Sequence, residues 1–145
     1  MSAETLFSIC NTSVLPGWAL LVLLPRWKWT LGIISSGIIP FVLGLVYGTL
    51  LLSQITSLPE GGGFGSLDAL MILFSSPDAV LVGWIHYLAF DLFIGAWELK
   101  DGQEKGIPHW MLIPCFALTF MAGPMGLVLY LVIRSIRTKS VLIYT

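Results

Sequence analysis

Residues 31–52 read LGIISSGIIPFVLGLVYGTLLL, a run of 22 residues without a charge. The hydrocarbon core of a bilayer is about 30 Å thick, and a helix of about 20 mostly apolar residues crosses it. A helix also satisfies its own backbone hydrogen bonds, which an apolar surrounding requires. This stretch therefore predicts a transmembrane helix.

Three further stretches of the chain meet the same test. Residues 5–24 and 108–133 carry no formal charge, and residues 79–98 are apolar except for His86, Asp91 and the closing Glu98. We expect an all-α integral membrane bundle that forms one domain over residues 1–145. Its elements are four transmembrane helices at about 5–24, 31–52, 79–98 and 108–133, and a short interfacial amphipathic helix at about 66–75.

The composition agrees with this class and excludes others. Of the 145 residues 57% are hydrophobic and 10% are charged, whereas soluble domains carry about 25% charged residues. Seven Lys and Arg nearly balance eight Asp and Glu, so no nucleic-acid partner is expected. Cys10 and Cys115 are far apart and form neither a disulfide framework nor a metal-binding CxxC motif.

The segment between the second and third spans contains the interfacial helix. Its apolar residues recur at i, i+3, i+4 and i+7, the spacing of one helix face; they are Leu67, Leu70, Met71 and Phe74. The helix is too short to span a bilayer, so we expect it to lie along the surface. The next residues, 76–78 (Ser-Pro-Asp), predict an N-cap and a proline at the first position of the third span.

The positive-inside rule does not orient a four-span chain. Four spans put both ends of the chain on one side of the membrane. Three basic residues then lie on that side and four on the other, which decides nothing; they are Arg134, Arg137 and Lys139 against Arg26, Lys28, Lys100 and Lys105. The lack of a basic residue before the first span favours termini that face away from the cytoplasm.

Residues 79–98 hold the side chains best suited to chemistry. A carboxylate near the middle of a span, such as Asp91, costs on the order of 2.5–3.5 kcal/mol to insert and is by default a candidate functional group. Trp84, Tyr87, Asp91 and Glu98 share one stripe of the helix. The alternative is that Asp91 only ties helices together through hydrogen bonds. His86 lies roughly 140° from Asp91 around a regular helix, so a ligand or a third residue would have to bridge them.

A tight turn between the last two spans suggests which residues share a level. If the chain folds back near residue 103, Asp91 faces Pro114 and Cys115, and His86 and His109 lie roughly 16 Å apart in depth. A single metal ion cannot bind both histidines, so we expect no metal and no cofactor. The charged residues of the turn, which are Lys100, Asp101, Glu104 and Lys105, are expected to be solvated.

The last span is rich in proline and small residues. Pro114 and Pro124 each remove a helical hydrogen bond and should kink the helix. Ala122, Gly123 and Gly126 permit close backbone approach, and a homodimer through them is plausible. We expect an aromatic-lined site with Asp91 and His86 as the catalytic residues. Its predicted substrate-binding residues are Trp84, Tyr87, Trp97, Glu98, His109, Pro114, Cys115 and Thr119.

Four motifs resemble those of the abscisic-acid-deficient-four-like family. They are GWIHYLAFDLF at 83–93, GIPH at 106–109, PC at 114–115 and GPMGL at 123–127. The first run is the specific one, and the similarity extends from Asn11 to Arg134. The chain carries no Arg- and Ser-rich transit segment, so we expect a multi-pass protein of a bacterial inner or thylakoid-type membrane.

The resemblance implies carotenoid chemistry, because the plant member of this family is associated with neoxanthin synthesis. Opening a 5,6-epoxide to an allene is an isomerisation that needs an acid and a base, and we assign Asp91 as the acid and neutral His86 as the base. A cis/trans isomerisation of another polyene is the alternative reaction. The expected partners are a carotenoid or other long polyene and membrane lipids. Non-catalytic carotenoid or lipid binding, or a role as an assembly subunit, stays open.

Overall fold

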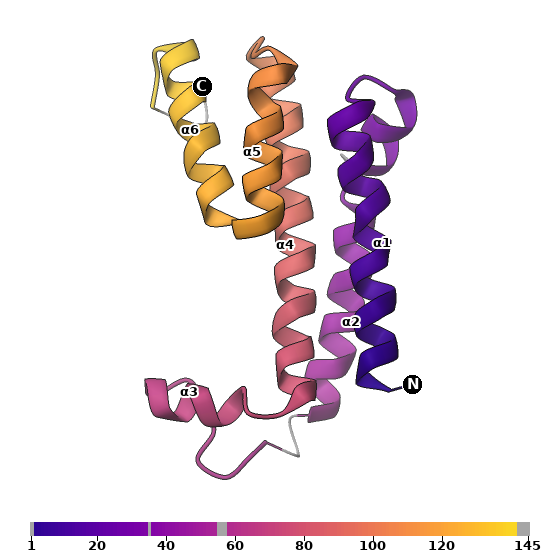
Figure 1. Cartoon of the computed structure of the whole chain (residues 1–145), viewed down its shortest axis with the longest axis vertical. Helices are drawn as coiled ribbons and strands as arrows, with labels where there is room; N and C mark the ends of the chain where they lie inside the picture. Colours follow the sequence, from indigo (N-terminus) through magenta and orange to yellow (C-terminus); the bar gives the residue numbers. More distant parts are fainter. Residues whose placement is uncertain (1, 35, 55–57, 142–145) are drawn as a thin grey trace.

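The computed structural model describes residues 2–34, 36–54 and 58–141, and all regular elements in these ranges are helical (Figure 1). In chain order they are α1 (Ala3–Leu23), the π-helical turn η1 (Thr30–Ile34), α2 (Ile38–Gln54), α3 (Leu67–Leu73), α4 (Pro77–Glu104), α5 (His109–Ala122) and α6 (Pro124–Thr138). Three segments are long and apolar enough to cross a membrane, namely Ala3–Leu23, Gly32–Gln54 and Pro77–Glu104. The predicted class, an all-α membrane bundle, is confirmed.

The predicted fourth span over residues 108–133 is wrong as a single helix. α5 ends at Ala122, the chain turns at Gly123 with φ 21° and ψ −83°, and α6 begins with Pro124 in its first turn. At 1.5 Å per residue, the 14 residues of α5 extend about 21 Å, which is less than the thickness of a bilayer core. α5 and α6 pack side by side as a helical hairpin (Figure 1). A proline suits the start of a helix, so Pro124 begins a new helix where a kink was expected.

α4 is the central helix of the bundle and begins as predicted. The Ser76 side chain accepts a hydrogen bond from the Ala79 amide at 3.2 Å, and Pro77 occupies the first turn. α4 then continues to Glu104, beyond its expected end at residue 98. The reversal into α5 therefore comes later in the sequence than expected, and this shifts which residues of the two helices face each other.

The core lies where α1, α2 and α5 pack on α4. Ile85, Leu92 and Leu99 of α4 are fully buried. α1 and α4 approach each other closely at Gly95, where an added Cβ would lie 2.7 Å from the Trp18 ring of α1. A larger residue at position 95 would push these two spans apart.

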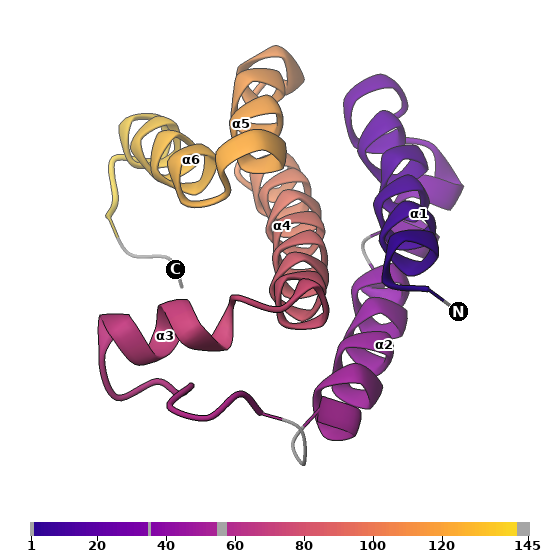
Figure 2. The ribbon, with the colours of Figure 1, turned by 60° about the horizontal axis from the view of Figure 1, so that its bottom comes forward.

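The two ends of the bundle differ in what they carry. Ser2, α3 and the loop before α3 lie at one end, with α3 crosswise to α4 (Figures 1 and 2). The α1–α2 connection, the α4–α5 turn and the end of α6 lie at the other (Figure 1). The prediction that both termini share a side is therefore wrong, because the hairpin returns the chain to the end it came from.

Charged side chains fasten α6 to α4. Arg134 is 1% exposed, and its Nε lies 2.6 Å from Oδ2 of Asp101. The buried Tyr130 hydroxyl donates a hydrogen bond to the same carboxylate oxygen. The expectation of a solvated Asp101 is wrong, because α4 continues past this residue and α6 covers it.

Removing one partner of a buried ion pair leaves an uncompensated charge. We therefore expect Asp101→Ala to lower the free energy of unfolding by about 3–5 kcal/mol, measured by denaturation of the detergent-solubilised protein. Glu104→Ala, at an exposed position of the same helix, is the matched control and should change little. Equal stability of the two variants would contradict the fastening role of Asp101.

Candidate functional site

One face of α4 carries the residues that the sequence singled out. Trp84, Tyr87, Asp91 and Glu98 follow one stripe, and Asp101 extends it three residues further. The three carboxyl groups of this stripe each meet a different part of the α5–α6 hairpin, in order along α4. Their surroundings differ, and this difference identifies the candidate site.

Glu98 is bound to α5. It is 0% exposed, and the Thr119 hydroxyl lies 3.0 and 3.2 Å from its two carboxylate oxygens. Cys115, also buried, interacts electrostatically with Glu98 and directs its thiol to the Met111 carbonyl at 3.4 Å. The structure thus brings together three of the predicted substrate-binding residues, but in an enclosed contact between α4 and α5.

Asp91 lies against the tip of the hairpin. An added Cβ on Gly123 would sit 2.6 Å from Asp91 Oδ1. The side chain is 9% exposed, and within the described part of the chain its buried Oδ2 has no hydrogen-bond partner. The expectation that Asp91 faces Pro114 and Cys115 is wrong, since the extended α4 moves the turn and brings Glu98 to the level of Cys115.

Tyr87 and Trp84 continue from Asp91 towards α1. The Tyr87 hydroxyl donates to the Phe120 carbonyl at 3.1 Å and lies close to the Asp91 carboxyl. The Trp84 ring stacks on Tyr87 with centroids 5.2 Å apart, and its indole N–H donates to the Asn11 side chain at 3.3 Å. Asp91 therefore has an aromatic row beside it, as expected.

His86 lies on another side of α4. Its ring is 4.5 Å from that of Phe90 and 5.6 Å from that of Tyr47 in α2. It lines an apolar cavity of about 510 Å³ between α2, α3 and α4. The structure does not bring His86 beside Asp91, and the catalytic roles assigned to both stay predictions.

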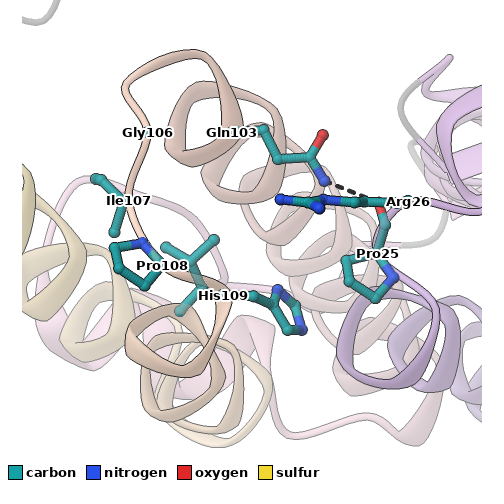
Figure 3. A pocket seen from close by; sticks show the side chains of 8 residues that line it. Pro25, Arg26, Gln103, Gly106, Ile107, Pro108 and His109 are labelled. Atoms are coloured by element: carbon teal, nitrogen blue, oxygen red, sulfur yellow. Dashed lines mark hydrogen bonds between the residues drawn. The ribbon is translucent and has the colours of Figure 1, made fainter.

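The remaining predicted residues lie apart from Asp91. His109 Nε2 is 2.9 Å from the Val22 carbonyl, and the ring lines a second cavity of about 400 Å³ at the α4–α5 turn (Figure 3). In this cavity Gln103 donates to the Pro25 carbonyl at 2.8 Å. Trp97 packs edge-on against Tyr130 with ring centroids 5.2 Å apart, and Pro114 is exposed on α5.

Two of the small residues that were predicted to mediate a homodimer make contacts within the chain itself. Gly126, proposed for dimer contacts, packs against Thr119 within the hairpin, and Gly123 packs against Asp91; the homodimer itself stays a prediction. Over residues 2–34, 36–54 and 58–141, no group of three or more His, Cys, Asp or Glu is placed to hold a metal ion.

The sequence comparisons identify the family of the chain. The profile of the ABA DEFICIENT 4-like family matches residues 5–130. The chain belongs to this family. A curated relative, Protein ABA DEFICIENT 4, chloroplastic, from Arabidopsis thaliana, is 29% identical over 140 residues, which cover 92% of this chain and 62% of the relative. The chain thus spans less than two thirds of that relative's length. No solved structure matches it.

Sequence reasoning on this ABA DEFICIENT 4-like protein missed Asp101, Tyr130 and Arg134. Asp101 follows Glu98 by three residues, so it continues the stripe already recognised. Tyr130 and Arg134 are four residues apart and share a face of α6. Both signals were present, but a continuous fourth span would have carried Arg134 away from Asp101.

The contact at the hairpin tip predicts the effect of one substitution. Gly123→Ala would place a methyl group against the Asp91 carboxyl, and such overpacking typically costs about 1–3 kcal/mol. We expect a lower midpoint of thermal unfolding in detergent. Gly44→Ala in α2, where an added Cβ meets nothing within 4 Å, is the control and should be neutral or stabilising, as alanine favours helices. Equal unfolding midpoints for the two variants would argue against a close contact at Gly123.

Proposed function

We propose that this protein is a membrane isomerase that acts on a xanthophyll or another long polyene, with Asp91 as the group that donates the proton. Its membrane is of the thylakoid type, which the chloroplastic relative supports. The family resemblance suggests the substrate class, and one feature of α4 supports the chemistry.

That feature is the contrast among the three carboxyl groups that face the hairpin. Asp101 is paired with Arg134, and Glu98 accepts a hydrogen bond from the Thr119 hydroxyl. A carboxyl in an apolar surrounding is costly unless it is paired or hydrogen-bonded. Asp91 differs from both, because the neutral Tyr87 hydroxyl lies beside its carboxyl and its Oδ2 is buried without a hydrogen-bond partner in the described structure. An intramembrane ionisable group of this kind is by default a functional one.

A single carboxylic acid can catalyse either isomerisation without a net change of protons. In epoxide opening, one oxygen gives its proton to the epoxide oxygen as the carbon–oxygen bond breaks. The other oxygen takes a proton from the adjacent polyene carbon, and the electron pair of that C–H bond completes the allene. In cis/trans isomerisation, the acid protonates the polyene, the weakened double bond rotates, and the carboxylate takes the same proton back. His86, in its separate cavity, need not be the base in either reaction.

Access to Asp91 is through the lipid. The hairpin runs along only part of α4 (Figure 1), and its tip at Gly123 lies against Asp91. Two side chains next to the tip are exposed on the outside of the bundle, Met121 to 78% and Met125 to 61%. In this proposal a membrane-dissolved substrate approaches the contact between Asp91 and the tip from the lipid, without passing through water.

The test is conversion of xanthophyll by the purified protein in lipid vesicles, with isomers separated by chromatography. Asp91→Asn keeps the shape of the side chain but removes the acid, so the rate should fall by about 10²-fold or more. Asp78→Asn, at an exposed position in the first turn of the same helix, is the control and should retain the full rate. Full activity of Asp91→Asn would refute the assignment.

Non-catalytic binding of a polyene or lipid is the second candidate. The 510 Å³ cavity beside His86 supports it, because this size suits a small-molecule site and the lining is mostly apolar, with Tyr47, Gln54 and His86 as its polar members. The same assay separates the two candidates. Pigment that copurifies with the wild-type protein but is never converted would favour binding alone.

A further inference from the structure

The hairpin gathers the positive charge of the chain at one end of the bundle. Arg26 and Lys28 lie in the α1–α2 connection, and Lys100 and Lys105 lie near the end of α4. The basic residues of α6 and the residue after it return to this same end (Figure 1); they are Arg134, Arg137 and Lys139. All seven Lys and Arg of the chain are thus on one side.

The opposite end is acidic. Glu4, Glu60, Asp68 and Asp78 lie there, and the described residues of that end include no Lys or Arg. At the basic end Arg134 is neutralised by its pair with Asp101. If Arg134 is left out, six basic residues lie at one end and none at the other. Four spans would instead divide the seven basic residues three to four.

α5 and α6 are each too short to cross the membrane, so the chain must return to the side from which α5 starts. α5 and α6 have 14 and 15 residues, about 21 and 22 Å, and neither reaches across a core of about 30 Å. Their turn lies at Asp91, which is 14 residues from Pro77 and 13 from Glu104, the two ends of α4. The hairpin therefore enters to about half depth and leaves by the side it entered.

We infer that residues 109–138 form a re-entrant hairpin and that the end carrying all the basic residues faces the side from which the chain is inserted, which is the cytoplasm in a bacterial inner membrane. Short segments next to membrane spans carry Lys and Arg on the cytoplasmic side, and this excess sets the orientation. The end with Ser2 and α3 then faces away. Trp27 and Trp29, exposed beside Lys28, fit the aromatic belt of the cytoplasmic interface.

Single cysteines at exposed positions test both parts of the inference. Glu104→Cys and Val141→Cys report on the basic end, and Glu60→Cys reports on the acidic end. The native Cys10 and Cys115 are buried, so the unaltered protein is the blank. Each protein is expressed in a bacterial inner membrane and treated with a membrane-impermeant maleimide, once in spheroplasts and once in inside-out vesicles.

We expect Glu104→Cys and Val141→Cys to react only in inside-out vesicles, and Glu60→Cys only in spheroplasts. If Val141→Cys reacts from the same side as Glu60→Cys, the hairpin is overturned and a fourth span is restored. If all three reverse together, the hairpin stands and the orientation is overturned. None of these outcomes depends on catalytic activity, so the inference can fail or succeed separately from the proposed function.

Discussion

The structure depends on a reversal of the chain in the apolar middle of the bundle. No water is available there to satisfy free backbone groups, so each must find a partner within the protein. Pro124 has no N–H to satisfy, and the amides of Gly126 and Leu127 bond back to the Gly123 carbonyl at 3.1 and 3.3 Å. The Tyr87 hydroxyl donates a hydrogen bond to the Phe120 carbonyl near the end of α5. The tip is therefore stabilised jointly by its own turn and by α4.

Beyond the tip, α4 binds the hairpin through polar contacts. In a membrane, apolar side chains gain little free energy by leaving the lipid for the protein interior. Lipid tails are as apolar as leucine, so association of helices relies on close packing and on hydrogen bonds between them. Glu98 supplies such a bond to α5 and Asp101 to α6. A buried pair gains little over apolar packing but is costly to break. The two contacts therefore specify where the hairpin sits more than they add to stability.

The sequence predicted the class and much of α4, and its errors have two physical causes, the reversal at Gly123 and the extension of α4 to Glu104. A hydropathy analysis counts apolar residues. Residues 108–133 contain as many apolar residues as a single transmembrane helix, so hydropathy alone predicts one span there. Whether Gly123 and Pro124 kink a helix or reverse it depends on their surroundings, and Gly123 contacts Asp91 and Tyr87, which lie far away in the sequence. The shared side of the termini followed from this decision. The misplaced register followed from ending α4 too early, and the solvated Asp101 followed from both errors. The stripe on α4 and the separation of His86 from Asp91, which depend on helix geometry alone, agree with the structure.

The depth of Asp91 bears on which isomerisation the proposed site would favour. Asp91 is about 20 Å along α4 from either end of the helix, so its carboxyl lies near the middle of the membrane. A long polyene that spans the bilayer keeps its polar ring ends at the two surfaces and its conjugated chain at this depth. Such a substrate presents double bonds to Asp91, and cis/trans isomerisation then needs only the proton that the carboxyl gives and takes back. Opening a ring epoxide would instead require one ring to sink to the tip of the hairpin, with the molecule inserted from one side. The depth of Asp91 along α4 matches the conjugated chain of such a substrate better than its rings, so the position of Asp91 favours the reaction on the chain over the reaction on the ring.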